Sequence, residues 1–524
     1  MARDFVTEAR ATERDPKRGN SARRAGRAVG SGKMRARSWR RGRGVRAGGG
    51  IDPRRIARSA VRGSDRLSAR LSAFAKAVAT GRVVVPMPSA RPRFPWRGAF
   101  VVLGAWLAVG FAPETAGAAP RRFGVTEEGA VADGQTLNTV AIQTAVDRAE
   151  SSGRGVVEIP AGTLLSGSIF LKRGVELWLA EGAVRLGSTN IEDDPKRETR
   201  SEGHFEPGRM ALVNAPGLTR VRIGGKGPIN GNGVPSWQAF WARRKENPKC
   251  THLEVERPRL LFVDNGREGR IEGLALQDAG FWMLPLDHCR DALIEGRRIT
   301  LPSAVNGLRG PSTDGIDGGS CQNVTIRRCA MATQDDTIAL KGSTGPLADQ
   351  DGPSPPVENI TVEDCEYGDG NGLITCGSEA TLVRNVTVRH CTLSDRATLL
   401  TRKLRPDTPP RDERITFDGI TLTGGGGGGR LLNVAPWTQF FDLKGQPAPS
   451  RIVSDVTLRH VRGEFRSMGT LRGNPGDGRR DLTLENIDLK LADETLALGP
   501  PENLVVKNGT VNGKPFVLPA PPSH

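Results

Sequence analysis

The stretch STDGIDGGSCQNVTIRRCAMATQDDTIALKG, residues 312–342, decides the fold. It contains two similar segments, DGI at 314–316 and DTI at 336–338, which lie 22 residues apart. Its central segment, NVTIRRC at 323–329, alternates apolar with polar residues, as a strand with one buried face does. A period of this length is typical of one coil in a solenoid of stacked strands.

Segments like NVTIRRC return through the second half of the chain. They are NITVEDC, NVTVRHC, RITFDGI, DVTLRHV, DLTLENI and NLVVKNG, beginning at residues 359, 385, 414, 455, 481 and 503. The spacings of 36, 26, 29, 41, 26 and 22 residues indicate coils joined by loops of different length. Leucine-rich and propeller repeats lack support, because their leucine spacing and blade-length period are missing. We predict an all-β fold, a single-stranded parallel β-helix, right-handed by the general preference of parallel crossovers.

One helix is predicted near the start of this solenoid, between residues 138 and 153. Asn138 is its expected N-cap, and its apolar positions recur at helical spacing at Ile142, Ala145, Val146 and Ala149. An amphipathic helix here would cover the open end of the strand stack. We therefore expect an N-terminal capping helix.

Cysteines and asparagines recur at fixed repeat positions. Cys329, Cys365 and Cys391 each lie six residues after Asn323, Asn359 and Asn385. Seven cysteines cannot all pair within one chain, so the recurrence favours packing in columns over disulfides. The NxT context of the asparagines also matches a glycosylation signal, but their recurrence favours a turn role.

The charge of +17 lies entirely in the first 86 residues, which hold 23 Lys and Arg against 6 Asp and Glu. The remainder has 52 of each sign. This opening segment lacks apolar periodicity and has few aromatic residues for base stacking, namely Phe5, Trp39 and Phe74, so we expect a disordered basic extension from a mis-assigned start, and no nucleic-acid partner. Residues 87–119 combine arginines, a 14-residue apolar run and small residues, which is the layout of a signal peptide, too short for a membrane anchor. Cleavage near Ala119 would give a secreted or periplasmic protein whose catalytic β-helix spans 120–524.

The candidate site comes from residues at equal repeat offsets. In a parallel stack, the 22-residue offset places Asp314 and Asp336 on adjacent rungs, about 4.8 Å apart. Asp335 shares a neighbouring column with Asn371, and Lys341 shares a third with Lys403. A carboxylate pair that positions water, with a separate acid beside it, suits an inverting glycoside hydrolase. The alternative is a solvated acidic turn.

Asp317 is read as structural support or as a substrate contact. His288, His390 and His460 are read as structural, because no metal-ligand spacing is present.

These residues resemble glycoside hydrolase family 28, the polygalacturonase-like enzymes of the pectin-lyase-like fold, over nearly all of 121–518. The matching segments are VAIQTAVDRAESSGRGVVEIPAGTLLSGSIFLK, INGNG, STDGID and QDDTIALK. The resemblance implies that Asp335 is the general acid and that Asp314 and Asp336 activate the water. It implies no cofactor and no metal.

Two segments depart from the family pattern. Its GHG appears as Gly370, Asn371 and Gly372, and its RIK is replaced by TRKLRPDTPP, which supplies Arg402, Lys403 and Arg405. With WTQFFDLKGQP at 437–447, this resembles a bacterial branch of the family. Cations at this edge suit a uronate carboxylate, and Trp437 is a candidate to stack on a sugar.

The sequence thus predicts a monomeric, exported hydrolase of galacturonic-acid-containing pectin, of polygalacturonase or rhamnogalacturonan hydrolase type. Its partner would be an acidic plant-type polysaccharide. The alternatives are a β-helix polysaccharide lyase that uses calcium, and a non-catalytic carbohydrate-binding β-helix.

Overall fold

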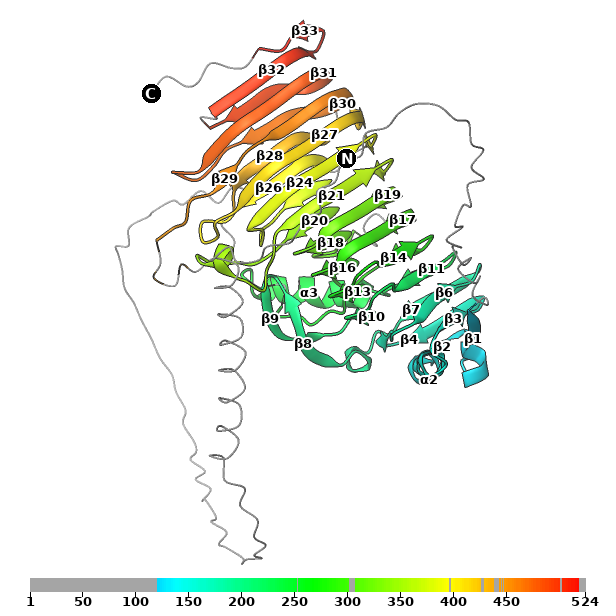
Figure 1. Ribbon diagram of the computed structural model, residues 1–524. Coiled ribbons are helices and arrows are strands. Elements are labelled where there is room, and N and C mark those ends of the chain that lie inside the picture. Colours follow the sequence, from blue (N-terminus) through cyan, green and yellow to red (C-terminus); the bar gives the residue numbers. More distant parts are fainter. Residues whose placement is uncertain are drawn as a thin grey trace, which may run out of the picture. The chain divides into compact units, whose positions relative to one another are not determined.

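The computed structural model describes residues 120–517 except 252, 301–306, 395–396, 426–427, 438–442, 444, 446 and 500–501. Its strands form one 31-stranded sheet and a separate two-stranded hairpin. In the large sheet, strands pair in parallel with the equivalent strand of the next coil, and only the final hairpin of β32 with β33 is antiparallel. Figure 1 shows this stack of coils. The predicted extension at 1–86 and signal peptide at 87–119 lie outside the described residues.

Each coil contributes up to three strands, and equivalent strands form three columns. The first column contains β1 (Arg121–Gly124), β3 (Gly155–Ile159), β6 (Val175–Leu179), β11 (Arg222–Gly225), β14 (Arg270–Glu272), β17 (Arg290–Thr300), β19 (Gln322–Ala332), β21 (Val357–Glu363), β24 (Leu382–Arg389), β27 (Arg411–Thr423), β29 (Ile452–Val453), β30 (Val456–Leu471), β31 (Gly478–Leu498) and β32 (Glu502–Val511). The second contains β2 (Asp133–Leu137), β4 (Gly162–Ser166), β7 (Ala183–Gly187), β12 (Pro228–Asn230), β15 (Ala275–Gln277), β22 (Glu366–Tyr367) and β25 (Thr392–Leu393), together with the continuations of long first-column strands.

The third column positions the candidate site. Its strands are β5 (Ile169–Phe170), β10 (Val213–Pro216), β13 (Leu261–Asp264), β16 (Leu284–Asp287), β18 (Ile316–Gly319), β20 (Ile338–Lys341), β23 (Ile374–Cys376), β26 (Thr398–Leu404) and β28 (Arg430–Pro436). Outside the columns lie β8 (Lys196–Ser201), β9 (His204–Arg209), β33 (Lys514–Pro515) and the 3-10 turns at Val125–Glu128, Ile191–Asp193 and Ala348–Gln350. The parallel β-helix predicted from the repeats is therefore present.

Aliphatic side chains stack rung upon rung inside the coils. Val324 pairs with Ile360, which pairs with Val386, and all three are buried. The same register brings Ile326 onto Val362, so the inward positions of each repeat meet inward positions of the next. Burial of each such side chain contributes about 1.5–3 kcal/mol, which a one-residue slip of a strand would forfeit.

The cysteine and asparagine columns match the sequence predictions. All seven cysteines are buried and free, and the Cys329 amide lies 3.5 Å from the Cys365 sulfur. Asn359 donates a side-chain hydrogen bond to Asn323 at 2.9 Å, and Asn385 donates to Asn359 at 3.0 Å. These three asparagines have φ of 56° to 57°, the left-handed conformation that Asn tolerates. The side chains thus form a ladder at positions where the backbone is left-handed.

Two helices are described, α2 (Thr139–Ser151) and α3 (Val234–Glu246). The predicted helix is α2; its apolar face is buried, including Ile142 and Val146, and it packs on β1, β3 and β5. Asn138 stands at its N-cap position, but the side chain binds Val131 and makes no cap bond. At 13 residues each, neither described helix has the length and apolar character to cross a bilayer.

The second helix, α3, was not predicted. It follows Gly233, carries Pro235 in its first turn and has three basic residues in its last turn before Glu246. Trp237 and Phe240 are its buried anchors, and the Trp237 indole donates to the Ala279 carbonyl at 2.9 Å. A proline followed by aromatic residues at helical spacing was the signal for it.

Candidate active site

The predicted carboxylate pair occupies adjacent rungs of the third column. Asp314 and Asp336 each lie two residues before a strand, and these strands pair with Ile316 opposite Ile338. The Gly315 amide donates to the Asp336 carbonyl at 2.9 Å, so the register extends through both aspartates. The 22-residue offset counted in the sequence is therefore the register of β18 on β20. Both side chains are buried.

Asp335 and Asn371 also meet as predicted. The Asn371 side chain donates to Asp335 Oδ1 at 3.0 Å, and the Asn371 amide donates to the Asp335 carbonyl at the same distance. The Asp336 amide also donates to Oδ1, at 3.0 Å. Asp335 is half-buried, unlike Asp314 and Asp336. It is thus the member of the three with access to solvent, held by an amide where the family pattern has an imidazole.

Lys341 and Lys403 both reach the carboxylates. Lys403 Nζ lies 2.6 Å from Asp336 Oδ2, whose other oxygen accepts from the Thr375 hydroxyl at 3.0 Å. Lys341 Nζ lies 3.1 Å from Asp314, 3.2 Å from Asp317 and 3.9 Å from Glu379. We call the set of Asp314, Asp317, Asp335, Asp336, Glu379, Lys341 and Lys403 the acid cluster.

Burial sets the protonation of this cluster. Removal from water raises the pKa of Asp314 well above its ordinary value, more than the charge of Lys341 lowers it. Burial likewise raises the pKa of Asp336, and Lys403 opposes that rise. Burial alone would lower the pKa of Lys341, but Asp314, Asp317 and Glu379 outweigh it and raise that pKa. The lysines therefore stay charged, and the carboxyls share protons.

Two tryptophans border the cluster. Lys341 Nζ lies 4.2 Å from the centre of the Trp282 ring, and Lys403 Nζ lies 5.0 Å from that of Trp437. Contacts of this kind favour the charged form of lysine. The predicted sugar-stacking residue Trp437 is half-buried and is thus beside the predicted site. Trp282 was not predicted, although its position two residues before β16 repeats that of Asp314 before β18.

The two predicted arginines lie in different surroundings. Arg402 is buried, with Nε 2.7 Å from Asp412 Oδ2, and each side chain is 1% exposed. Its guanidinium thus forms an ion pair inside the coil. This does not match the predicted substrate contact, because a buried and paired cation cannot reach a sugar. Arg405 makes two hydrogen bonds to Asp407, at 2.8 and 2.7 Å. The carboxylates of Asp407, Glu379 and Glu202 outweigh burial and raise its pKa, so Arg405 lies near the cluster.

Sequence reasoning missed two acidic residues, Glu379 and Glu202. Glu379 is buried; burial acts to raise its pKa, but the charge of Lys341, the hydrogen bond from Ser378 and the charge of Lys403 together lower it. Glu202 lies at the turn between β8 and β9, where burial and the charge of Glu379 raise its pKa to about 7. Glu379 follows β23 by three residues and could have been placed by the register. Glu202 comes from a hairpin outside the repeats, so no repeat count could reach it.

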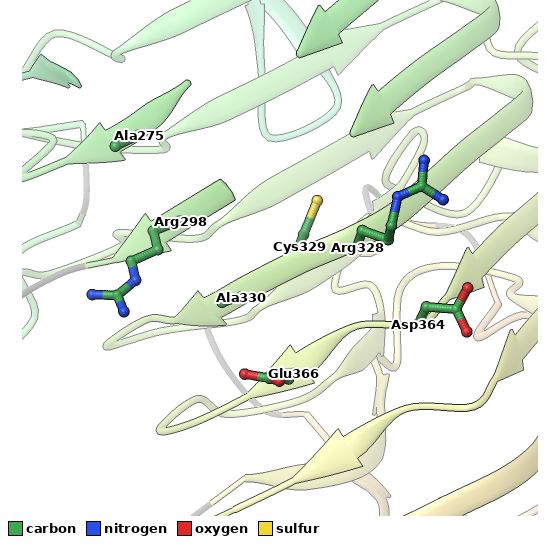
Figure 2. Close-up of a pocket in the computed structure, with 7 residues that line it drawn as sticks. All are labelled: Ala275, Arg298, Arg328, Cys329, Ala330, Asp364 and Glu366. Atoms are coloured by element: carbon green, nitrogen blue, oxygen red, sulfur yellow. The ribbon is translucent and has the colours of Figure 1, made fainter. Parts of the chain in front are cut away.

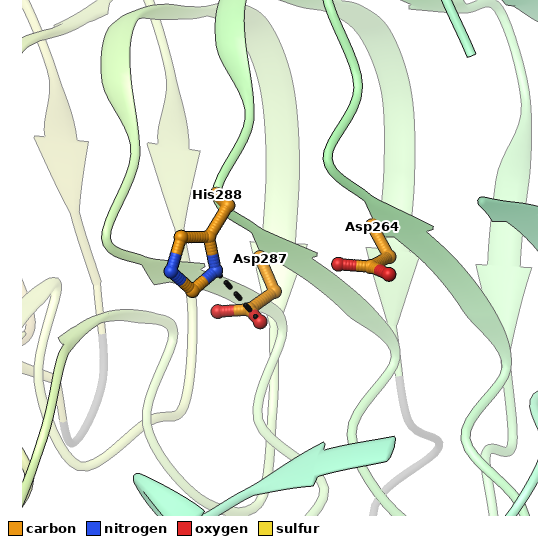
Figure 3. Close-up of side chains that lie close together, drawn as sticks. All are labelled: Asp264, Asp287 and His288. Carbon is orange, nitrogen blue, oxygen red and sulfur yellow. Dashed lines mark ion pairs between the residues drawn. The ribbon is translucent and has the colours of Figure 1, made fainter. Parts of the chain in front are cut away.

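A second acidic group contains Asp264, Asp287 and His288, whose ligand atoms lie within 4.8 Å of one another (Figure 3). His288 Nδ1 lies 3.0 Å from Asp287, and its Nε2 contacts the Pro353 carbonyl. Arg200 Nη1 also lies 3.3 Å from Nε2, and the hydrogen bond to Asp287 raises the His288 pKa. Both ring nitrogens thus contact protein groups, and the structural role of His288 stays a prediction.

A hollow of about 450 Å³ lies on the coil surface beside the first and second columns (Figure 2). Its lining residues are Ala275, Arg298, Arg328, Cys329, Ala330, Asp364 and Glu366. They belong to or adjoin β15, β17, β19 and β22, and none belongs to the acid cluster. The hollow is therefore separate from the candidate active site.

The fold and site define a class: a parallel β-helix with clustered carboxylates beside its third column. In comparison with protein families, residues 196–499 match the Glycosyl hydrolases family 28. The chain belongs to this family. A probable polygalacturonase of Vitis vinifera is 34% identical over 222 residues, which are 41% of this chain and 43% of that protein.

Other relatives agree with this assignment. A probable polygalacturonase of Arabidopsis thaliana is 27% identical over 304 residues, covering 57% of this chain and 58% of its own. The chain thus spans about half the length of these two relatives. The crystal structure of a hyperthermoactive exopolygalacturonase from Thermotoga maritima superposes with a TM-score of 0.62 at 21% identity, covering 76% of this chain and 93% of that one. At that identity the likeness concerns the fold.

Proposed function

We propose that the protein hydrolyses galacturonic-acid-containing pectic polysaccharide, of polygalacturonase or rhamnogalacturonan type, by single displacement with inversion. The observation that carries the proposal is the register of β18 on β20, which stacks Asp314 and Asp336 beside Asp335. Inverting hydrolases need one carboxylic acid for the leaving oxygen and another carboxylate to activate water.

Asp335 is suited to the acid role because it is the solvent-accessible member of the three. Asn371 and the Asp336 amide both donate to Oδ1, and among the described residues no hydrogen bond ends on Oδ2. Oδ2 is thus the oxygen that can hold a transferable proton. Asn371 fixes the carboxyl without adding a titrating group, so the chain dispenses with the imidazole of the family pattern.

Asp336 and Asp314 are suited to hold and deprotonate the water. Thr375 and Lys403 fix the two oxygens of Asp336, and Lys341 fixes Asp314. Burial raises both pKa values, which makes each carboxylate a stronger base than an exposed aspartate. No metal or cofactor enters these steps.

The substrate assignment rests on the cations and the indole at this edge. Arg405 adjoins the cluster, and Lys403 lies against Trp437. A uronate carboxylate can pair with Arg or Lys while the sugar ring packs on the indole. An acidic plant-type polysaccharide is therefore the proposed partner.

Assays of reducing ends test the function. Polygalacturonate and rhamnogalacturonan are incubated with the protein, with Asp335→Asn and with the exposed control Glu198→Gln. Release by the protein and the control, but not by Asp335→Asn, is expected. Ultraviolet-absorbing unsaturated products that disappear with EDTA would instead establish a calcium-dependent lyase. Binding without products from either polymer would establish a non-catalytic carbohydrate-binding protein.

The remaining proposals concern the whole chain. A secreted or periplasmic location, after cleavage near Ala119, is supported by the apolar run and small residues of 87–119. The right-handed turn of the coils follows the general preference of parallel crossovers. Packing of α2 on β1, β3 and β5 supports its role as the cap. Mass spectrometry of the exported protein tests the location, and a peptide from residues 1–86 in the intact precursor would contradict the proposed start.

A further inference from the structure

The β8–β9 hairpin begins on the side of the coil stack that carries the proposed catalytic aspartates. It lies between β7 of the second column and β10 of the third. Asp335 and Asp336 lie in the equivalent connection of a later coil, between β19 and β20. The two strands of the hairpin are labelled in Figure 1.

The turn of the hairpin is fastened beyond the other end of the third-column strands. Arg200 donates to the Gly342 carbonyl at 2.8 Å and to the Ser354 hydroxyl at 2.9 Å. His204 lies 2.6 Å from the Thr344 hydroxyl. These partners belong to the loop that follows β20, past Lys341. The hairpin therefore runs across the third column from one side to the other.

The hairpin rests on the same column of side chains that carries the catalytic pair. The register places Trp282 one rung from Asp314, because Leu284 pairs with Ile316. It places Arg259 one rung further, because Val263 pairs with Leu286. Arg259 donates to the Thr199 hydroxyl and the Arg200 carbonyl of the hairpin, both at 3.0 Å. The hairpin thus meets this column two rungs, or roughly 10 Å, from Asp314.

Close packing leaves little space under the turn. Gly203 has a φ of 83°, and a Cβ added there would lie 3.1 Å from the Thr344 amide nitrogen and 3.2 Å from the Gly342 carbonyl oxygen. A polysaccharide that follows the third column would therefore meet a fixed barrier shortly after passing the catalytic aspartates.

Charge adds to this barrier. Glu202, at the turn, is half-buried and lies within electrostatic reach of Glu379 and Lys341. A continuing pectic chain would bring its next carboxylate to these two glutamates, and this carboxylate is repelled by both when the pH exceeds the Glu202 pKa of about 7. A terminal sugar instead offers a hydroxyl, which a glutamate can bind.

We propose that the β8–β9 hairpin closes the substrate path and makes the enzyme act at chain ends, with Glu202 as a residue that recognises the terminal sugar. This proposal rests on the proposed hydrolase function. The class of substrate is a pectic chain end, and the product of each step is a short fragment of constant length.

The test follows products from galacturonate oligomers and from polygalacturonate over time. The unmodified protein is expected to release one short product from the first minutes, with little loss of viscosity per bond cleaved. A variant with residues 198–207 replaced by Gly-Gly is expected to cut internally, giving oligomers of mixed length. Arg200→Ala, which removes the fastening of the turn, is expected to shift the pattern in the same direction.

Point variants at the turn separate recognition from folding. Glu202→Gln is expected to weaken the preference for chain ends over internal bonds by about fivefold, the scale of one solvent-exposed charge pair. Glu198→Gln, the same substitution at an exposed position of the hairpin, should leave it unchanged. Melting curves identify variants that fail to fold.

The outcomes are distinguishable. Mixed oligomers from the unmodified protein at early times would overturn chain-end action and leave the hydrolase proposal intact. The same holds if folded Gly-Gly and Arg200→Ala variants keep the original product pattern. An absence of products from both substrates would overturn the hydrolase proposal on which this one rests.

Discussion

Lys403 Nζ lies 2.6 Å from Asp336 Oδ2, although the two residues are 67 positions apart in the chain. Two coil steps of the solenoid separate them, and the stack of β20, β23 and β26 brings them together. The lysine is held over Trp437 by a 5.0 Å contact. Its charge opposes the rise in the Asp336 pKa that burial causes. The pKa of Asp336, the proposed base, is therefore lowered by a lysine two rungs away.

Substitution of Lys403 by Met is expected to move the acid limb of the pH–rate profile upward. Asp336 must be deprotonated to act as a base, so activity falls as the pH drops through its pKa. Without Lys403 that pKa rises, and the acid limb should shift by roughly one unit or more. The measurement is kcat/KM against pH. The control is Lys226→Met, which removes an exposed lysine that pairs with Glu181. An unmoved acid limb would show that Asp336 is not the titrating base.

Substitution of Asp335 by Asn is expected to lower kcat by about 10²–10⁴-fold, the usual contribution of a general acid. Asn keeps the shape and hydrogen-bonding oxygen but cannot donate a carboxylic proton. KM should change little. Substrates with an activated leaving group, which needs no protonation, should recover much of the rate. Equal losses with natural and activated substrates would argue against the acid role.

Substitution of Arg402 by Met is expected to destabilise the protein without affecting substrate affinity. It leaves Asp412 buried without its partner, at a cost of about 3–5 kcal/mol at neutral pH. Denaturant unfolding measures the loss, and KM reports on the sugar. Combining it with Asp412→Leu should restore most of the stability, because no lone buried charge remains. A raised KM in a variant of native stability would show that Arg402 contacts the substrate after all.

The stability of the protein is expected to carry a pH dependence from Asp412. Burial raises its pKa to about 6, more than Arg402 lowers it. Between about pH 4 and 6 the folded state therefore binds more protons than the unfolded chain, so the free energy of unfolding falls as pH rises. The full contribution of this group is roughly 3 kcal/mol. Asp412→Asn should flatten this slope, and an unchanged slope would assign it to other groups.

Much of the fold followed from counting. The repeats at 323, 359 and 385 carry their own register, because inward aliphatic residues must meet inward residues in the next coil. The same count placed Asp314 on Asp336 and Asp335 on Asn371, since columns hold for polar residues as well. Offsets specify which rungs are neighbours, whichever loops intervene.

Side-chain direction was beyond the reach of that count. Arg402 and Lys403 are adjacent in sequence, yet one points to the interior and the other to the acid cluster, as alternation along β26 requires. Which of the two faces inward depends on the register of β26 with β23, where Cys376 pairs with Arg402. The β8–β9 hairpin was not predicted for another reason: it has no counterpart in the other repeats.

The asparagine ladder on the outside of the coils has a bearing on how such a chain can vary. Asn323, Asn359 and Asn385 hold one another at 2.9 and 3.0 Å, although 36 and 26 residues separate them. Each side chain fixes where the next coil starts, regardless of how many residues the previous loop contains. Insertions can therefore accumulate in the loops without disturbing the alignment of the aspartates, which leaves the surroundings of the substrate free to diverge while the chemistry is inherited unchanged.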